Sequence, residues 1–542
     1  MHLGNKYLTC LELNSIIVSF KNITIMNDKK WSNYQIDIFN AIKNSNKNII
    51  VNAVAGSGKT TTIVEACKRL KLFPNKVQFL AFNKSIANEL AEKLKGYAQV
   101  NTLHSFGYAV LRQAFKGKRI IIDDKKYIRL LQNNICDWSK YINHEEMSNV
   151  EIYNSCCQIK KIFDLARVNL VKYGDIESLR GICDAYGICD EFDELEIVNL
   201  LLKDCYKMSD SRVIDFTDMV VLPLSYRTYI STFKFVFIDE CQDLNAAQRE
   251  LMLCAAKGGR FIAVGDRKQA INGFCGADCL SFDKIAETPN TIELPLSVNY
   301  RCGSNIIKLV QEIVPQIQAC NTAESGKVES YRLLSKSLFH KGDMVLCRKS
   351  APLVGLCFKL LQNGITAVVK GGDIAESMLK LINKANCNSI DELSKWIDDE
   401  KKKTATEIAE YLKISLDKAK KTKRYLNLSD RLDCIKNICV SQLTDVSELK
   451  DYINKMFDET NIKNAVVLST AHKSKGLEAD RVLILTPSDF PMITKYSKDW
   501  EIQQEYNLKY VAWTRAKKEL VFVDMSESDI QAAEISDEEN DK

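Results

Sequence analysis

Closely spaced cysteine pairs are absent from this sequence. Its 542 residues contain 19 cysteines, but these are scattered and no C-x-x-C pair occurs. Zinc and iron–sulfur sites usually need such pairs, so we expect no structural metal. A secretory signal with a basic start and a small-residue cleavage site is missing as well. The cysteines are therefore expected to be reduced thiols of a cytosolic protein rather than disulfides.

Long apolar runs and a strong excess of one charge are also missing. The apolar stretch Ser15–Phe20 is too short to span a bilayer, so we expect no membrane partner. The 75 basic and 70 acidic side chains give a net charge of +5, which is too mild to demonstrate a nucleic-acid partner. Residues 526–542 are rich in Asp and Glu and are expected to form an exposed tail. Residues 1–26 are expected to be an N-terminal extension, with Met26 as an alternative start.

What is present describes a folded chain of several domains. A hydrophobic content of 46% and a charged content of 27% are typical of soluble globular proteins. The length suggests about three or four folding units. No repeat at a fixed period is evident.

Short apolar runs alternate with helical segments in two parts of the chain, which predicts an α/β fold with two parallel-sheet cores. The runs lie at residues 48–51, 77–82, 235–238 and 260–264, and again at residues 344–347, 465–468, 481–485 and 520–523. Each core is expected to carry a mainly helical insertion. The expected boundaries are 27–110 and 214–285 for the first core, 111–213 for its insertion, 286–384 and 461–525 for the second core, and 385–460 for a short second insertion.

A glycine-rich loop follows the first apolar run and opens a helix. This strand–loop–helix context is the one that a phosphate-binding loop requires, although Ala53 stands where the strict pattern has glycine. Glycines allow backbone N–H groups to approach phosphate oxygens, Lys59 supplies a positive charge, and the Thr60 hydroxyl suits Mg²⁺. The alternative is a glycine-rich turn that binds nothing. The expected nucleotide-binding residues are Ala55, Gly56, Ser57, Gly58, Lys59, Thr60 and Thr61.

Two adjacent carboxylates, Asp239 and Glu240, end another buried run. Asp239 is expected to hold Mg²⁺, and Glu240 to take the proton from an attacking water. Acidic residues at strand ends are common, so the pair gains weight only together with the loop. The two features jointly predict a site that hydrolyses a nucleoside triphosphate.

An ordered series of motifs resembles the UvrD/Rep/PcrA-type helicases of superfamily 1. The series covers most of the chain, and its order and spacing carry the resemblance better than any single member. The matching segments are Gln35, Gly56–Thr60, Phe82–Lys84, Thr102–Ser105, Asp215–Asp218, Asp239–Asp243, Gly265–Gln269, Asn299–Arg301, Cys347–Arg348, His472–Glu478 and Tyr510–Ala516. The resemblance implies that both cores are RecA-like.

It also implies roles around a bound ATP. Gln35 would read the adenine edge, since an amide both donates and accepts, and Tyr300 would stack on the base. Arg301 and Arg515 would reach the γ-phosphate from the second core. Taken alone, Gln35 is equally a surface glutamine, and both arginines are more often surface ion-pair partners.

Three further positions receive roles from the resemblance. Gln269 would couple the γ-phosphate to the nucleic-acid groove. Glu478 would contact the nucleotide sugar. Arg348 matches an arginine of the second core whose role is less defined.

A helicase must also bind the strand along which it moves, and proteins hold single strands by aromatic stacking and phosphate contacts. The resemblance places Phe82, Asn83, His104 and Phe274 along the strand groove of the first core, and His472 on the second. Without the resemblance, an aromatic residue such as Phe82 at the end of an apolar run is more often core packing.

The sequence departs from the family pattern in three places. Asn272 and Cys275 stand where relatives often carry an aromatic residue and an arginine, which puts the grip on the strand in doubt. Asn507 replaces an arginine, so no nucleotide contact is assigned to it. The second insertion is far shorter than the regulatory domain of large bacterial members. Its lysine runs 401–403 and 418–424 either touch duplex phosphates or form a solvated helix face.

Together these features predict an ATP- and Mg²⁺-dependent DNA helicase or translocase, with 3′ to 5′ polarity implied by resemblance. Expected partners are single-stranded DNA, single-strand/duplex junctions and possible loading proteins, with a monomer acting in replication, repair or recombination. The expected location is the cytoplasm, or a nuclear or viral replication compartment in a eukaryotic host. An RNA helicase, a translocase that strips proteins from DNA, and a nucleotide-binding adaptor remain alternatives.

Overall fold

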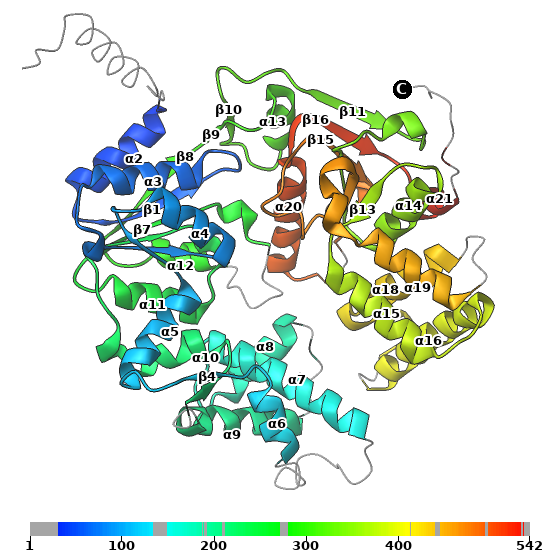
Figure 1. The fold of residues 1–542 in the computed structure, drawn as a ribbon, viewed down its shortest axis with the longest axis horizontal. Helices are drawn as coiled ribbons and strands as arrows, with labels where there is room; N and C mark the ends of the chain where they lie inside the picture. The colour runs from blue at the N-terminus through cyan, green and yellow to red at the C-terminus, as the bar shows by residue number, and fades with distance from the viewer. Residues whose placement is uncertain are drawn as a thin grey trace, which may run out of the picture.

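The computed structural model contains two six-stranded parallel sheets that stand side by side (Figure 1). Helices cover both sheets, which is why the strands read as continuous apolar runs. Every segment expected to be a buried strand is a strand, so the α/β prediction with two RecA-like cores is confirmed. The described residues are 31–133, 149–186, 188, 192–208, 212–271, 280–411, 414–439, 445–493, 497–532 and 535.

The first sheet has the strand order β3-β2-β6-β7-β1-β8. Ile50 on β1 packs into one apolar layer, and its neighbours Ile49 and Val51 pack into the layer on the opposite face. This alternation lets helices bury both faces of the sheet. The strands are β1 Asn48–Ala53, β2 Val77–Ala81, β3 Gln99–Thr102, β6 Phe235–Ile238, β7 Arg260–Gly265 and β8 Thr291–Leu296. The helices are α2 Asn33–Asn44, α3 Lys59–Arg69, α4 Lys84–Lys93, α5 Leu103–Ala114, α10 Asp218–Val221, α11 Ala246–Ala255 and α12 Ser281–Ala286.

The second sheet has the order β11-β16-β15-β12-β14-β13. A two-stranded pair, β9 Val298–Asn299 and β10 Gln318–Ala319, precedes it in the chain. The strands are β11 Lys327–Tyr331, β12 Met344–Cys347, β13 Ala367–Val369, β14 Val466–Thr470, β15 Ala479–Leu485 and β16 Ala516–Val523. The helices are α13 Ser304–Val310, α14 Ala351–Gln362, α15 Gly372–Ala385, α20 Asp499–Trp513 and α21 Glu527–Ala532.

Two expected boundaries are corrected by the structure. Strand β8 lies beyond the expected end of the first core at residue 285, yet it pairs with β1 along its whole length, so the first core extends to Leu296. As an edge strand it alternates polar and apolar residues and contains Pro295, so its sequence does not show the apolar run that a buried strand has. The exposed tail expected from residue 526 is wrong for its first residues. They form α21, whose Ile530 is buried against the second core.

The two insertions relate to their cores differently. The first has its own apolar cluster around Tyr127 and Phe163 and lies below the first core in Figure 1. Apolar residues of the second, among them Ile397 and Ile435, share one cluster with α14 of the second core. The insertion elements are β4 Ile121–Ile122, α6 Lys126–Asn133, α7 Asn149–Val168, α8 Ile176–Tyr186, α9 Phe192–Met208 and β5 Val213–Ile214, then α16 Ile390–Tyr411, α17 Leu416–Ala419, α18 Lys423–Cys439 and α19 Val446–Met456.

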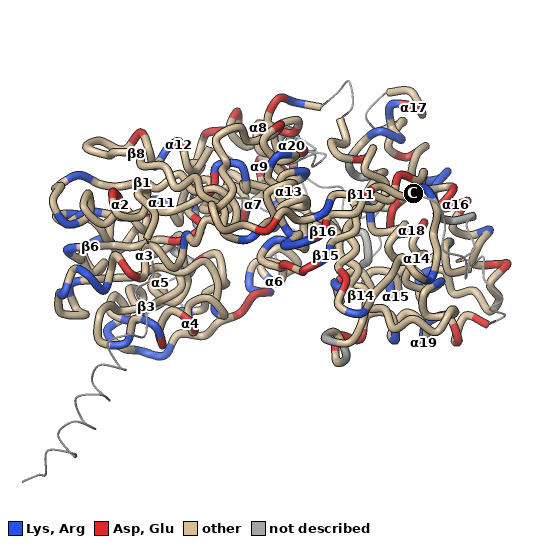
Figure 2. Tube along the Cα trace, turned by 90° about the horizontal axis from the view of Figure 1, so that it is seen from above, with Lys and Arg blue, Asp and Glu red and all other residues tan. Residues whose placement is uncertain are grey.

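Basic and acidic residues are interspersed along the trace (Figure 2). Within the second insertion, Lys401 pairs with Asp433, and Lys403 lies 3.8 Å from Glu407. These lysines of the run at 401–403 are therefore used in ion pairs inside the insertion. Among the described residues, no helix combines the length and apolar character needed to cross a membrane.

A buried ion cluster joins the first insertion to its core. Arg167 on α7 is bonded to Asp215 at 2.7 Å and to Asp218 at 2.6 Å, and its guanidinium lies over the Tyr127 ring. The Asp218 N–H donates to the Asp215 carboxylate at 2.7 Å, which fixes the turn between them. The Asp215–Asp218 segment therefore has a structural role, because it holds α7 of the insertion to the first core.

Replacing Arg167 with methionine is expected to lower the free energy of unfolding by about 3–5 kcal/mol, because two buried carboxylates lose their closest counter-charge and keep only the more distant Lys126 and Lys160. Urea denaturation measures the change. Lys161→Met, at an exposed position of the same helix, is the matched control and should shift stability by no more than about 0.5 kcal/mol. Equal effects of the two substitutions would contradict the proposed contribution of the cluster.

Candidate nucleotide-binding site

The glycine-rich loop connects the end of β1 to the start of α3. Gly56 and Gly58 adopt φ of 64° and 76°, and Gly58 is the N-cap of α3 without a side-chain cap. A Cβ on Gly56 would lie 2.6 Å from Asn299 Nδ2 and 2.7 Å from Arg301 Cβ. Only glycine fits such a position. The loop therefore leaves the backbone N–H groups at the start of α3 available to phosphate oxygens.

The two carboxylates at the end of β6 face this loop. The Thr60 hydroxyl donates to Asp239 Oδ2 at 2.5 Å, and Lys59 Nζ lies 3.4 Å from Glu240 Oε2. Hydroxyl and carboxylate oxygens are the kind of ligand that Mg²⁺ prefers, so Thr60 and Asp239 could hold this ion together with water and phosphate oxygens. Gln242 Nε2 donates to Glu240 Oε2 at 2.6 Å and fixes that side chain.

Burial and neighbouring charges separate the two carboxylates in acidity. Burial, reinforced by the charge of Glu240, raises the pKa of Asp239. Burial also disfavours a charged Glu240, but Lys59 and Lys475 outweigh it and hold the pKa of Glu240 below its ordinary value. Glu240 also sits at a φ of 52°, a strained conformation that is concentrated at functional sites. Glu240 is therefore ionised at neutral pH, the state in which a carboxylate can accept a proton.

The second core closes directly onto the loop. Asn299 Nδ2 donates to the Ala55 carbonyl at 2.7 Å, and the Tyr300 N–H donates to the Gly56 carbonyl at 2.9 Å. Val54 and Ala55 belong to an apolar cluster otherwise made mainly of second-core residues. The Tyr300 ring remains 45% exposed beside the loop, which suits stacking on a base.

Both predicted arginines lie at this junction. Arg301 pairs with Glu478 at 2.7 Å and donates to the Thr514 carbonyl at 3.3 Å. Arg515 is 2% exposed and donates to the carbonyls of Val511 and Leu477. Burial and the charge of Arg301 lower the pKa of Arg515 to about 10, so it remains charged at neutral pH. Arg301 therefore lies against the loop of the first core, and Arg515 is near enough for the charge of Glu240 to act on its pKa.

Other predicted nucleotide residues have protein partners. Gln35 donates to the Thr62 hydroxyl at 2.9 Å and accepts from the Ser32 N–H at 3.0 Å, which places it against the first turns of α3. Glu478 also pairs with Lys517 at 2.7 Å. Burial opposes its charge, but Lys517 and Arg301 lower the pKa of Glu478. Its contact with a nucleotide sugar stays a prediction.

Predicted strand-track residues follow the carboxyl ends of parallel strands. Phe82 follows β2 and is 37% exposed, and His104 lies in the first turn of α5 after β3. Asn83 caps α4 by accepting the Ile86 N–H at 2.9 Å, which gives it a structural role. Phe274 lies outside the described residues.

His472 follows β14 in the second core. Burial and the charge of Arg348 lower the pKa of His472 to about 3, so its ring is neutral near pH 7. Arg348 itself makes a bidentate ion pair with Glu505, with its shortest contact at 2.7 Å. A neutral ring can stack on a base or donate one hydrogen bond.

Several contacts between the cores were missed by the sequence reasoning. Lys475 Nζ bonds Asp243 at 2.6 Å and the Gln269 carbonyl at 2.8 Å. Asn507 Nδ2 donates to the Ala270 carbonyl at 3.0 Å, and Tyr510 reaches the phosphate loop. Lys475 and Tyr510 lie inside the motif segments, which was the available signal, but their partners are set by the tertiary structure.

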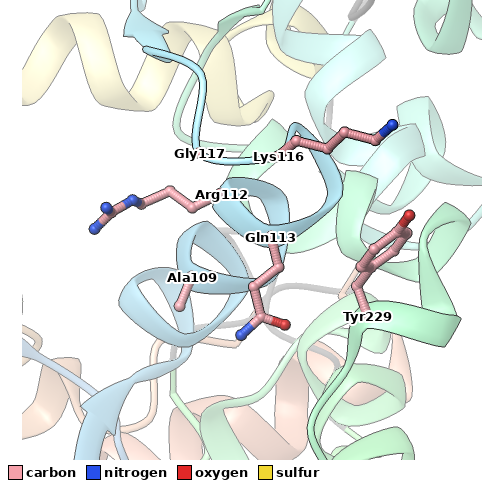
Figure 3. Close-up of a pocket in the computed structure, with 6 residues that line it drawn as sticks. All are labelled: Ala109, Arg112, Gln113, Lys116, Gly117 and Tyr229. Carbon is pink, nitrogen blue, oxygen red and sulfur yellow. The ribbon is translucent and has the colours of Figure 1, made fainter.

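An open cavity of about 530 Å³ lies elsewhere, at the end of α5 (Figure 3). None of its lining residues belongs to the predicted site. They are Ala109, Arg112, Gln113, Lys116, Gly117 and Tyr229.

Two RecA-like cores that meet at the phosphate loop of the first are the arrangement expected of a P-loop nucleoside triphosphatase. The UvrD/REP helicase N-terminal domain matches residues 35–290. A probable DNA helicase II homolog of Mycoplasma genitalium is 24% identical over 86% of this chain and 81% of its own length. The F-box DNA helicase protein 1 of Schizosaccharomyces pombe is 22% identical over 95% of this chain and 60% of its own length. The ATP-dependent DNA helicase PcrA of Staphylococcus aureus (strain Mu50) is 26% identical over 51% of this chain and 39% of its own length.

The chain is thus similar to the UvrD/Rep/PcrA-type helicases, and the match to the helicase domain lies in its first 290 residues. It spans most of the Mycoplasma relative but only part of the other two.

Proposed function

We propose that this protein is an ATP-dependent DNA helicase or translocase that moves along single-stranded DNA. The observation that carries the proposal is that the nucleotide site is divided between the cores. Lys59 and Glu240 lie on the first core, while Arg515 comes from the second and is near enough for the charge of Glu240 to act on its pKa. Similarity to the UvrD/REP helicase domain and to relatives named ATP-dependent DNA helicases supports ATP hydrolysis and DNA as the substrate.

Each side chain has a defined task in this scheme. A magnesium ion held by Thr60 and Asp239 would neutralise phosphate charge, and Lys59 would bind the phosphates. Glu240 would accept the proton of the attacking water. Arg301 and Arg515 would stabilise the charge that develops on the transferred phosphoryl group.

Movement would follow from opening and closing of the same cleft. Phe82 and His104 lie on the first core and His472 on the second, so each core would hold part of one strand. Closure on ATP and release after hydrolysis would then step the protein along the strand. We propose 3′ to 5′ movement from the resemblance to UvrD/Rep/PcrA-type helicases, with junctions as substrates in replication, repair or recombination.

The deciding experiment compares ATP hydrolysis with and without single-stranded DNA, followed by unwinding of 3′-tailed and 5′-tailed duplexes. We expect DNA to stimulate hydrolysis and only the 3′-tailed duplex to be unwound. Stimulation without unwinding would favour a translocase that strips proteins, and equal stimulation by RNA would favour an RNA motor. Absence of hydrolysis would leave the adaptor alternative.

Replacing Phe82 with alanine is expected to weaken single-strand binding by about 5- to 150-fold, the equivalent of about 1–3 kcal/mol for one stacked base. Intrinsic hydrolysis should be largely retained. Phe73 is the matched control, because it is 80% exposed and lies before the opposite end of β2. Fluorescence anisotropy with a labelled oligonucleotide measures both variants, and equal affinities would remove Phe82 from the track. Phe274→Ala is expected to behave like Phe82→Ala.

A further inference from the structure

Tyr510 on α20 of the second core is fully buried against the first core. Its hydroxyl accepts the Ala55 N–H at 2.6 Å and donates to Asp266 Oδ2 at 3.0 Å. Ala55 belongs to the phosphate loop, and Asp266 follows β7. One hydroxyl from the second core therefore ties together two segments of the first.

The hydrogen bonds continue from Asp266 to predicted catalytic groups. Asp266 Oδ2 also accepts from Gln269 Nε2 at 2.8 Å. The Asp266 N–H donates to Gln242 Oε1 at 3.1 Å, and Gln242 Nε2 in turn donates to Glu240. Hydrogen bonds thus connect Tyr510 to the phosphate loop directly, and to Gln269 and Glu240 through Asp266.

Two neighbours hold the same segment from the second core. Asn507, one turn before Tyr510 on α20, donates to the Ala270 carbonyl at 3.0 Å. Lys475 donates to the Gln269 carbonyl at 2.8 Å. The backbone around Gln269 is therefore fixed by groups that the second core supplies.

These bonds can exist only while the two cores are in contact. If the cleft opened, the Ala55 N–H and the Asp266 carboxylate would lose a buried partner together and would need water instead. A phenylalanine would keep the ring packing at this position but would leave the Ala55 N–H without its partner. The hydroxyl, and not the ring, would therefore make the phosphate loop and Asp266 depend on contact between the two cores.

We propose that Tyr510 is a positioning residue that couples cleft closure to the orientation of Gln269 and of the phosphate loop. The proposal rests on the proposed function, since it assigns a means by which strand engagement controls hydrolysis. Tyr510 contacts neither phosphate nor water in this scheme. It acts through Asp266.

The test is Tyr510→Phe, with Tyr506→Phe on the exposed side of the same helix as the matched control. We expect DNA-stimulated kcat to fall by about 10- to 100-fold in Tyr510→Phe, as expected when a buried donor is left unpaired, while KM for ATP changes by less than about threefold. Tyr506→Phe should match the wild type in both. Hydrogen exchange at the loop peptide containing Ala55 should be faster only in Tyr510→Phe.

A double-mutant cycle separates coupling from a general structural effect. If Tyr510 acts through Gln269, Tyr510→Phe combined with Gln269→Ala should be no slower than the slower single variant. Additive losses, or a Tyr510→Phe protein with wild-type stimulation, would overturn the inference. A wild-type protein that DNA fails to stimulate would instead overturn the proposed function.

Discussion

Replacing Lys59 with alanine is expected to abolish DNA-stimulated ATP hydrolysis. The Lys59 side chain is only 11% exposed, and although burial favours its neutral form, Glu240, Asp266 and Asp239 outweigh burial and raise the pKa of Lys59. The ammonium group is therefore charged at neutral pH and is predicted to bind the phosphates. Its loss should lower kcat by about 10³-fold, to background, and weaken ATP binding, because the clustered carboxylates would then repel phosphate.

Glu240→Gln tests the same site differently. The amide preserves size but cannot take a proton, so kcat should fall by about 10²–10⁴-fold while ATP still binds. Steady-state hydrolysis and binding of a fluorescent ATP analogue separate the two variants. Lys76→Ala and Glu287→Gln, at exposed positions of the first core, are the controls. Full activity in either Lys59→Ala or Glu240→Gln would contradict the assignment of this site.

Replacing Arg301 or Arg515 with alanine is expected to reduce kcat by about 10³–10⁵-fold. Both arginines come from the second core, and the Arg301 Cβ lies 2.7 Å from where a Cβ on Gly56 would be, so their effect on the phosphates requires the two cores to be in contact. Lysine should not restore activity at Arg515, because only a guanidinium can reach the Val511 and Leu477 carbonyls together.

Arg332→Ala is the matched control, since Arg332 lies on the second core and its side chain is 83% exposed. Arg515 also satisfies backbone carbonyls, so thermal unfolding must accompany the kinetics. A loss of activity that merely parallels a loss of folded protein would assign Arg515 a structural role. A thermally stable Arg515→Ala protein with normal kcat would remove it from the site.

Much of the fold followed from local patterns. The runs at 48–51 and 344–347 predicted buried parallel strands because helices on both faces make every strand position apolar. Strand β8 escaped prediction because an edge strand meets solvent and tolerates Glu293 and Pro295. The first tail residues escaped because one isoleucine among acidic residues gives little signal, yet Ile530 packs into the second core.

The sequence by itself determined the phosphate loop and its carboxylate partners, because a strand, a glycine turn and a helix start are encoded within a few residues. Only the tertiary structure decided which groups complete the site. Tyr510 and Ala55 are separated by 455 positions in the chain, and their hydrogen bond depends on how two separately built cores meet. Local patterns indicate which interactions a residue can make, whereas the packing of the two cores decides which partner it makes them with.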